Sequence, residues 1–142
     1  MKMNDSTMPR WMREHVHEYL SSNGARGHIW NGIPTLLLTT TGRRTGESRL
    51  IPLIYGKYEK AYVVVASKGG SPSHPSWYLN LDNQSAVQVQ VGEQKFDAKA
   101  RTSNGEERAQ LWEIMCGVFP TYSEYQSKTD REIPVVVLDP ID

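Results

Sequence analysis

The sequence predicts an α+β domain whose mainly antiparallel sheet closes into a small barrel. The chain of 142 residues suits one domain, spanning residues 1–142, with one hydrophobic core. About six segments have the composition of strands, and most are joined by short turns that are typical of hairpins. A few segments have helical periodicity, and they flank the strands instead of alternating with them.

The first predicted element is an amphipathic helix over residues 9–22. Pro9 suits the first turn of a helix, and four large residues fall on one face: Met12, Val16, Tyr19 and Leu20. Residues 1–8 are polar and are expected to be disordered. Residues 25–34 are rich in glycine and end in a proline, which predicts a loop.

The strands are expected at residues 35–41, 49–56, 61–67, 86–91, 95–102 and 132–140. The alternating segment "AVQVQV" predicts a strand that is buried on one face. Residues 56–60 and the pair Gly92-Glu93 are expected to form hairpin turns.

Two further helices complete the prediction, with a helical turn between residues 119 and 130. "SWYLNL" at residues 76–81 is expected to form a short helix, and residues 105–118 a longer one with Leu111, Met115 and Val118 aligned. Ser103 with Glu106, and Thr121 with Glu124, have the spacing of capping boxes.

The composition excludes several classes of function. The formal net charge is zero, and the aromatic residues are not interleaved with a broad basic face, so nucleic-acid binding is not expected. His15 and His17 point in different directions on a helix, while His28 and His74 lie in separate loops, so no metal site is expected. Cys116 is the one cysteine and is predicted to be a core residue.

A cytoplasmic location is expected. No intrachain disulfide can form, the first residues lack the apolar segment of a signal peptide, and no apolar run reaches the ~20 residues that span a bilayer.

The segment "TTTGRRTGESR" predicts an anion site at a hairpin tip. Its glycines free main-chain amides, and Arg43, Arg44 and Arg49 supply guanidinium donors. If the segment is a hairpin, Arg49 returns to the mouth that Arg43 occupies. The alternative is a charged tip that only prevents edge pairing.

The segment "SKGGSPSHPSW" leaves a later strand in the same way. Lys68 and the two glycines after it resemble a second anion cradle, and Trp77 and Tyr78 suit a planar ligand. The alternative is that both rings cap the core beneath the loop. Two such loops favour one shared anionic ligand.

Tyr122 and Tyr125 lie three residues apart, on one side of the predicted helical turn. Their phenols can donate hydrogen bonds or a proton to a carbonyl or nitro oxygen. The alternative is that they fix the loop by packing with Phe119.

The residues from 35 to 140 resemble the deazaflavin-dependent nitroreductase family, which comprises actinobacterial coenzyme F420-dependent reductases. The segments that carry the resemblance are "LLLTTTGRRTGESRLIPL", "YVVVASKGGSPSHPSWYLNL", "VQVQVG" and "FPTYSEYQSKTDREIPVVVLDP". The resemblance implies a split β-barrel related to FMN-binding oxidases. It also implies coenzyme F420, a deazaflavin with a phosphodiester and an anionic polyglutamate tail.

The resemblance assigns roles to individual residues. Cofactor binding falls to Arg43, Arg44, Thr45, Arg49, Ile51, Pro52, Val65, Ala66, Ser67, Lys68, Ser76, Trp77, Tyr78, Asn80 and Tyr122. Tyr122, Tyr125 and Ser67 are the candidate catalytic residues. Two departures are visible: Arg44 stands where lysine is common, which preserves the charge, and Phe119 stands where some nitroreductases have tyrosine.

The implied activity is hydride transfer from reduced F420 to a quinone, an activated enone or a nitroaromatic compound. An F420 carrier without catalysis and an FMN- or haem-binding split barrel are the alternatives. A homodimer is expected because split barrels of this kind are often dimers. The helix at residues 9–22 is expected to pack over the barrel or the mouth of the site, with contact to a membrane surface as the alternative.

Overall fold

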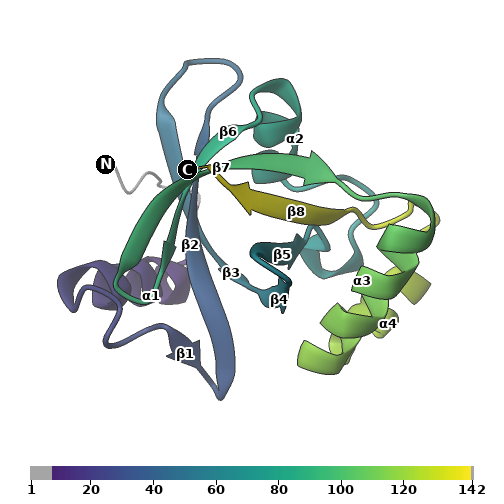
Figure 1. The fold of residues 1–142 in the computed structure, drawn as a ribbon, viewed down its shortest axis with the longest axis horizontal. Helices are drawn as coiled ribbons and strands as arrows, with labels where there is room; N and C mark the ends of the chain where they lie inside the picture. The colour runs from purple at the N-terminus through teal and green to yellow at the C-terminus, as the bar shows by residue number, and fades with distance from the viewer. Residues whose placement is uncertain (1–7, 142) are drawn as a thin grey trace.

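The computed structural model describes residues 8–141 and has an α+β architecture, as predicted (Figure 1). The helices are α1 (Arg10–Ser21), η1 (Lys68–Gly70, a 3-10 turn), α2 (Ser76–Asn83), α3 (Gly105–Val118) and α4 (Thr121–Ser127). The strands are β1 (Ile29–Trp30), β2 (Ile33–Thr41), β3 (Ser48–Ile54), β4 (Gly56–Tyr58), β5 (Ala61–Val65), β6 (Ala86–Val91), β7 (Gln94–Thr102) and β8 (Val135–Pro140).

The strands form one antiparallel sheet in the order β1-β2-β6-β7-β8-β5-β4, and β3 pairs with β2 outside this path. β3 also contacts β5, so the sheet curls back on itself. Figure 1 shows α1 on one side of the curl, α3 and α4 on the other, and α2 beside the tip of the β2–β3 hairpin. The curled antiparallel sheet confirms the predicted fold class.

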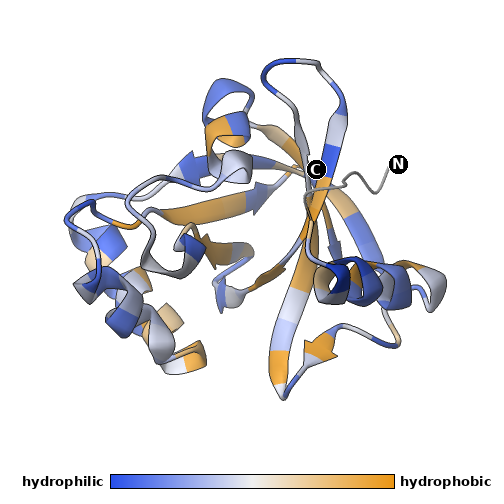
Figure 2. Ribbon diagram, turned by 180° about the vertical axis from the view of Figure 1, so that it is seen from behind, coloured by the Kyte–Doolittle hydropathy of each residue, from blue (hydrophilic) through white to orange (hydrophobic). Residues whose placement is uncertain are grey.

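Two hydrophobic clusters fill the two faces of the sheet. One includes Leu36, Leu38 and Val136 inside the curl, and the other places Leu111 and Met115 of α3 against the opposite face of β5 and β8. Figure 2 shows hydrophobic strands meeting at the centre and a hydrophilic β2–β3 tip. Cys116 is half-buried against the second cluster, and burial raises the pKa of its thiol.

Helix α1 packs on β2 and β3 through Val16 and Tyr19, which are fully buried. The Tyr19 hydroxyl donates to the Thr35 carbonyl at 3.0 Å and accepts from the Gly92 amide at 2.8 Å. Burial raises the pKa of Tyr19 to about 12. The hydroxyl therefore stays protonated at neutral pH and ties the helix to the β6–β7 turn.

One expectation about the buried face of the first helix was wrong. Leu20 is exposed, and His15 is buried in its place because its Nε2 lies 2.8 Å from the Gly27 carbonyl. Of the segment expected to be disordered, residues 1–7 lie outside the described residues, and Met8 packs against the α1 cluster.

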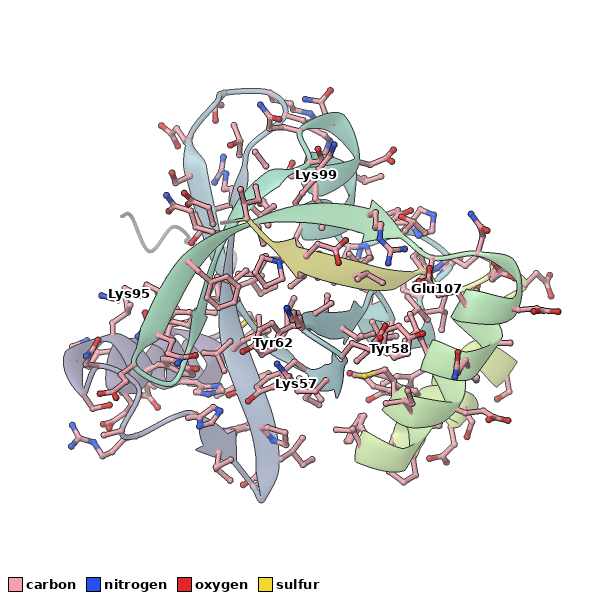
Figure 3. All side chains as sticks on the ribbon, viewed as in Figure 1. Lys57, Tyr58, Tyr62, Lys95, Lys99 and Glu107 are labelled. Atoms are coloured by element: carbon pink, nitrogen blue, oxygen red, sulfur yellow. The ribbon has the colours of Figure 1, made fainter. Side chains whose placement is uncertain are left out.

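Two predicted loops contain strands. Within residues 25–34, Asn31 and Gly32 both have positive φ, which closes a tight hairpin between β1 and β2. Residues 56–60 contain β4, and the turn is restricted to Glu59 and Lys60. In Figure 3, Lys57 of β4 lies beside Tyr62 of β5, with its ammonium 4.1 Å from the ring centre.

Neither predicted capping box forms. The Ser103 hydroxyl donates to the Val135 carbonyl at 2.7 Å, so Asn104 becomes the N-cap of α3 without a side-chain bond. Pro120 is the N-cap of α4, also without a side-chain hydrogen bond. α3 is instead tied to β7 by Glu107 (Figure 3), which accepts two bonds from Arg101, at 2.6 and 3.0 Å.

No helix within residues 8–141 is long and apolar enough to cross a membrane.

Candidate functional site

A groove of about 780 Å³ lies between the β2–β3 tip, α2, η1 and the start of α1. It is lined by Met8, Pro9, Met12, Gly42, Arg43, Arg44, Arg49, Leu50, Ile51, Lys68, Ser76, Trp77 and Asn80. The structure therefore brings the two glycine-rich loops to one mouth, as the sequence predicts.

The β2–β3 tip is built so that Arg49 returns to this mouth. The Gly42 amide donates to the Glu47 carbonyl at 2.7 Å, which closes the tip. A Cβ on Gly42 would lie 3.2 Å from Arg49 Nε, so glycine lets the guanidinium cross the main chain. Arg49 also lies 4.0 Å from the Glu47 carboxylate.

Asn80 of α2 joins the two loops. Its Oδ1 accepts from the Arg43 amide at 3.2 Å and from Arg43 Nη1 at 2.8 Å, and its Nδ2 donates to Thr40 Oγ1 at 3.3 Å. The Asn80 side chain is buried, so these bonds are shielded from water. They fix one predicted cation against the helix that carries Ser76 and Trp77.

The second loop bends sharply after β5. Lys68 has a φ of +46°, in the left-handed region, and the next two glycines have φ of +63° and +83°. The Lys68 ammonium donates to Ser73 Oγ at 3.3 Å and faces the groove.

Nothing in the sequence pattern marks Arg131, yet it organises this loop. Its guanidinium bonds to the carbonyls of Ala66, Ser67 and Ser71 and contacts His74. All four partners lie 57 to 65 residues earlier in the chain, so no local motif reveals the contact.

The groove combines cationic side chains with apolar surface. Four lining side chains are cationic, and none of the described residues that line the groove carries a carboxylate. Trp77, Leu50 and Ile51 supply apolar wall, and Trp77 is also part of the core. Such a site suits an elongated ligand with an anionic part and a planar apolar part.

Several predicted site residues lie outside the groove lining. Pro52 of β3 is buried and does not line the groove. The others are Thr45, whose hydroxyl accepts from the Glu47 amide, Val65, Ala66 and Tyr122, which are core residues, Ser67, and Tyr78, whose hydroxyl lies 2.8 Å from Thr102 Oγ1.

Tyr122 and Tyr125 lie on one side of α4, as predicted, with ring centres 6.3 Å apart. Both rings pack with Phe119 in the cluster beneath α3. This is the arrangement expected if the two tyrosines fix the loop by packing. Burial strongly raises the pKa of Tyr122, so its phenol stays protonated at neutral pH. Tyr125 is less buried and adjoins Gly70 of η1.

Comparisons with known proteins agree with this geometry. Residues 11–140 match the family described as F420H(2)-dependent quinone reductase. An F420H(2)-dependent quinone reductase of Mycobacterium tuberculosis is 40% identical over 142 residues, which cover 91% of this chain and 95% of the relative. A second, shorter match in the same organism is 34% identical and covers 76% of this chain and 91% of the relative.

Solved structures support the same assignment. An F420-H2 dependent reductase (FDR-A) is 45% identical, covers 75% of this chain and 94% of its own, and has a TM-score of 0.70. A structure described as a domain-swapped dimer is 40% identical, with 91% and 97% coverage and a TM-score of 0.73. The haem storage protein HutZ of Vibrio cholerae, at 15% identity and a TM-score of 0.60, shares the fold.

The family match spans nearly the whole chain and includes both loops of the groove, which confirms the split-barrel and F420 predictions. The chain therefore belongs to the F420H(2)-dependent quinone reductases, a family of oxidoreductases that use reduced coenzyme F420.

Proposed function

We propose that this chain binds F420H2 in the groove and reduces a quinone there. The observation that carries the proposal is the groove itself, which joins four cations to an apolar wall around Trp77. When bound, the reduced deazaflavin supplies a hydride from C5. The protein's part is to hold the ring, exclude water and stabilise the charge that develops on the acceptor.

The residues present fit this cofactor. Arg43, Arg44 and Lys68 provide a cationic rim for the phosphodiester and the glutamyl tail, and Asn80 holds Arg43 in place. Trp77 and Ile51 offer apolar surface for the ring. The side chains of Val65 and Ala66 face the core and the carbonyls of Ala66 and Ser67 accept from Arg131, so these residues would shape the loop beside the ring.

Tyr122, Tyr125 and Ser67 remain the candidate groups for bonding the acceptor oxygen and supplying its proton. α4 contacts η1, so Tyr125 lies beside the loop that carries Ser67 and Lys68. A phenol hydroxyl at this position can donate to a developing oxyanion. The acceptor would then enter from the α4 side.

Quinones are the preferred acceptors, because the matching family is named for their reduction. Activated enones and nitroaromatics share the electrophilic character that hydride transfer requires. Phe119 packs 5.0 Å from the Tyr122 ring and brings no hydroxyl to this region. We therefore expect quinones to be better substrates than nitro prodrugs.

A fluorescence titration tests the proposal. Saturable quenching of tryptophan fluorescence by F420, and not by FMN, is expected because Trp77 lines the groove. Quenching by FMN alone would instead favour an FMN-binding barrel. Steady turnover of menadione with F420H2 separates an enzyme from an F420 carrier.

Replacing Arg43 or Arg44 by alanine should weaken F420 binding about 5- to 10-fold, because both arginines line the groove in which the anionic tail is proposed to lie. The loss should shrink as salt is added and grow with the number of glutamates in the tail. Arg26→Ala is the matched control, since Arg26 pairs with Glu18 away from the groove. Equal losses for every tail length would contradict this role.

Replacing Tyr125 by phenylalanine should lower kcat about 10-fold while leaving the Kd for F420 within twofold, because only the hydroxyl is removed. Steady-state oxidation of F420H2 by menadione measures kcat, and tryptophan quenching measures the Kd for F420. Tyr58→Phe is the control, since Tyr58 lies on β4 away from the groove. Unchanged turnover would show that Tyr125 is not the donor.

The homodimer, the cytoplasmic location and the membrane contact remain predictions. A homodimer is proposed from the relative described as a domain-swapped dimer. α1 packs on the sheet and its first turn lines the groove, as expected, while Trp11 and Ile29 nearby are 51% and 58% exposed. This pair would be the contact with a quinone-bearing membrane, and sedimentation with liposomes at low and high salt tests it.

A further inference from the structure

Arg131 lies half-buried between α4 and β8, and its side chain spans one whole loop. Nε donates to the Ser71 carbonyl at 2.7 Å, Nη2 to the Ser67 carbonyl at 2.7 Å, and Nη1 to the Ala66 carbonyl at 3.2 Å. Nη1 also lies 3.0 Å from Nδ1 of His74. One guanidinium thus fixes the loop at both ends.

The loop that Arg131 spans has a strained backbone. Lys68 has a φ of +46°, which is unfavourable for a residue with a side chain, and Gly69 and Gly70 continue in the left-handed region. Such strain persists only where the surrounding structure holds it. A Cβ on Gly70 would lie 2.6 Å from the Tyr125 carbonyl oxygen, so α4 confines the loop from the other side.

His74 completes the contact as a neutral ring. Burial, and then the nearby Arg131 charge, lower the pKa of His74, which leaves Nδ1 free to accept from the guanidinium. The His74 ring also packs 4.9 Å from Tyr78 of α2. The Arg131 contact therefore extends to the helix that lines the groove.

We propose that Arg131 is a positioning residue for the cofactor. It holds the loop from residue 66 to 74 in the bend that keeps Lys68 on the wall of the groove, which Arg43 also lines. The identity of the ligand rests on the proposed function, whereas the loop geometry does not. Arg131 itself does not line the groove, so it acts through Lys68.

A double-mutant cycle on Lys68 and Arg131 tests this, with the Kd for F420 measured by tryptophan quenching. Lys68→Gln should weaken binding about 5-fold and Arg131→Gln about 10-fold. The double variant should also lose about 10-fold, because Lys68 contributes little once its loop is released. A product near 50-fold, or no loss for Arg131→Gln, overturns the proposal.

Arg108→Gln is the matched control. Arg108 is also half-buried and donates from Nη2 to the Ile133 carbonyl at 2.7 Å, but it lies on α3 and does not line the groove. Its replacement should lower Tm without changing the Kd. A loss of affinity equal to that of Arg131→Gln would mean that general destabilisation explains both, which overturns the proposal.

If the Arg131→Gln variant does not fold, Arg131→Lys tests the role of Arg131 instead. Lysine preserves the charge but cannot reach all the acceptors at once, so about a 3-fold loss is expected, and unchanged affinity overturns the proposal. A wild-type chain that does not bind F420 overturns the proposed function. Wild-type binding with independent effects in the cycle overturns only the role of Arg131.

Discussion

Replacing Asn80 by alanine is expected to weaken F420 binding about 30-fold and to lower the free energy of unfolding by about 2 kcal/mol. The amide bonds the Arg43 main chain, the Arg43 guanidinium and Thr40, all in a buried position. Its loss leaves these groups without their partner and releases the β2–β3 tip from α2. Binding must then order the tip, and this ordering reduces the net free energy of binding.

The measurements are the Kd for F420 from tryptophan quenching and a urea unfolding curve. Asn83→Ala is the matched control, because Asn83 lies exposed at the end of the same helix. It should change neither quantity measurably. Tighter binding by Asn80→Ala would show instead that the amide competes with the ligand for Arg43.

Replacing Gly24 by alanine is expected to destabilise the fold by about 3 kcal/mol or more. Gly24 has a φ of +86°, and a Cβ there would overlap the carbonyl of Gly92. The main chain must move apart at this point, which also breaks the bond from the Gly92 amide to Tyr19. The backbone strain and the lost hydrogen bond both lower the free energy of unfolding.

Gly117→Ala is the control for this variant, with unfolding followed in urea by tryptophan fluorescence. Gly117 lies in α3, and a Cβ there meets no heavy atom within 4 Å. This substitution should be neutral or stabilise by about 0.5 kcal/mol. Equal midpoints for the two variants would contradict the close packing at Gly24.

The sequence pattern predicts most of the sheet and the convergence of the two loops, because hairpin turns and glycine-cation segments are local signals. It fails for His15, whose burial depends on a carbonyl that the loop after α1 supplies. It also fails for Ser103, because β8 offers its hydroxyl a better-placed acceptor than the helix start. Both outcomes depend on tertiary contacts that no short window contains.

In the candidate site, too, some residues could be predicted from the sequence and others depend on tertiary contacts. The arginines of "GRRTG" stand out by their number, and resemblance to a known family places Trp77 and Asn80 beside them. Tyr78 bonds to Thr102 instead, and Pro52 is buried outside the groove. Arg131 is visible only in three dimensions, since its partners are distant in sequence.

The two halves of the proposed reaction are carried by different stretches of the chain. The cationic side chains that line the groove come from the β2–β3 hairpin and from the loop leading into α2. The candidate acceptor side is the short helix α4, which packs on η1 from outside. Exposed positions of α4, such as Ser123 and Glu124, can therefore be varied in a mutant library without changing a residue that lines the groove. Such variants could be screened for new hydride acceptors while the residues that line the proposed coenzyme site stay unchanged.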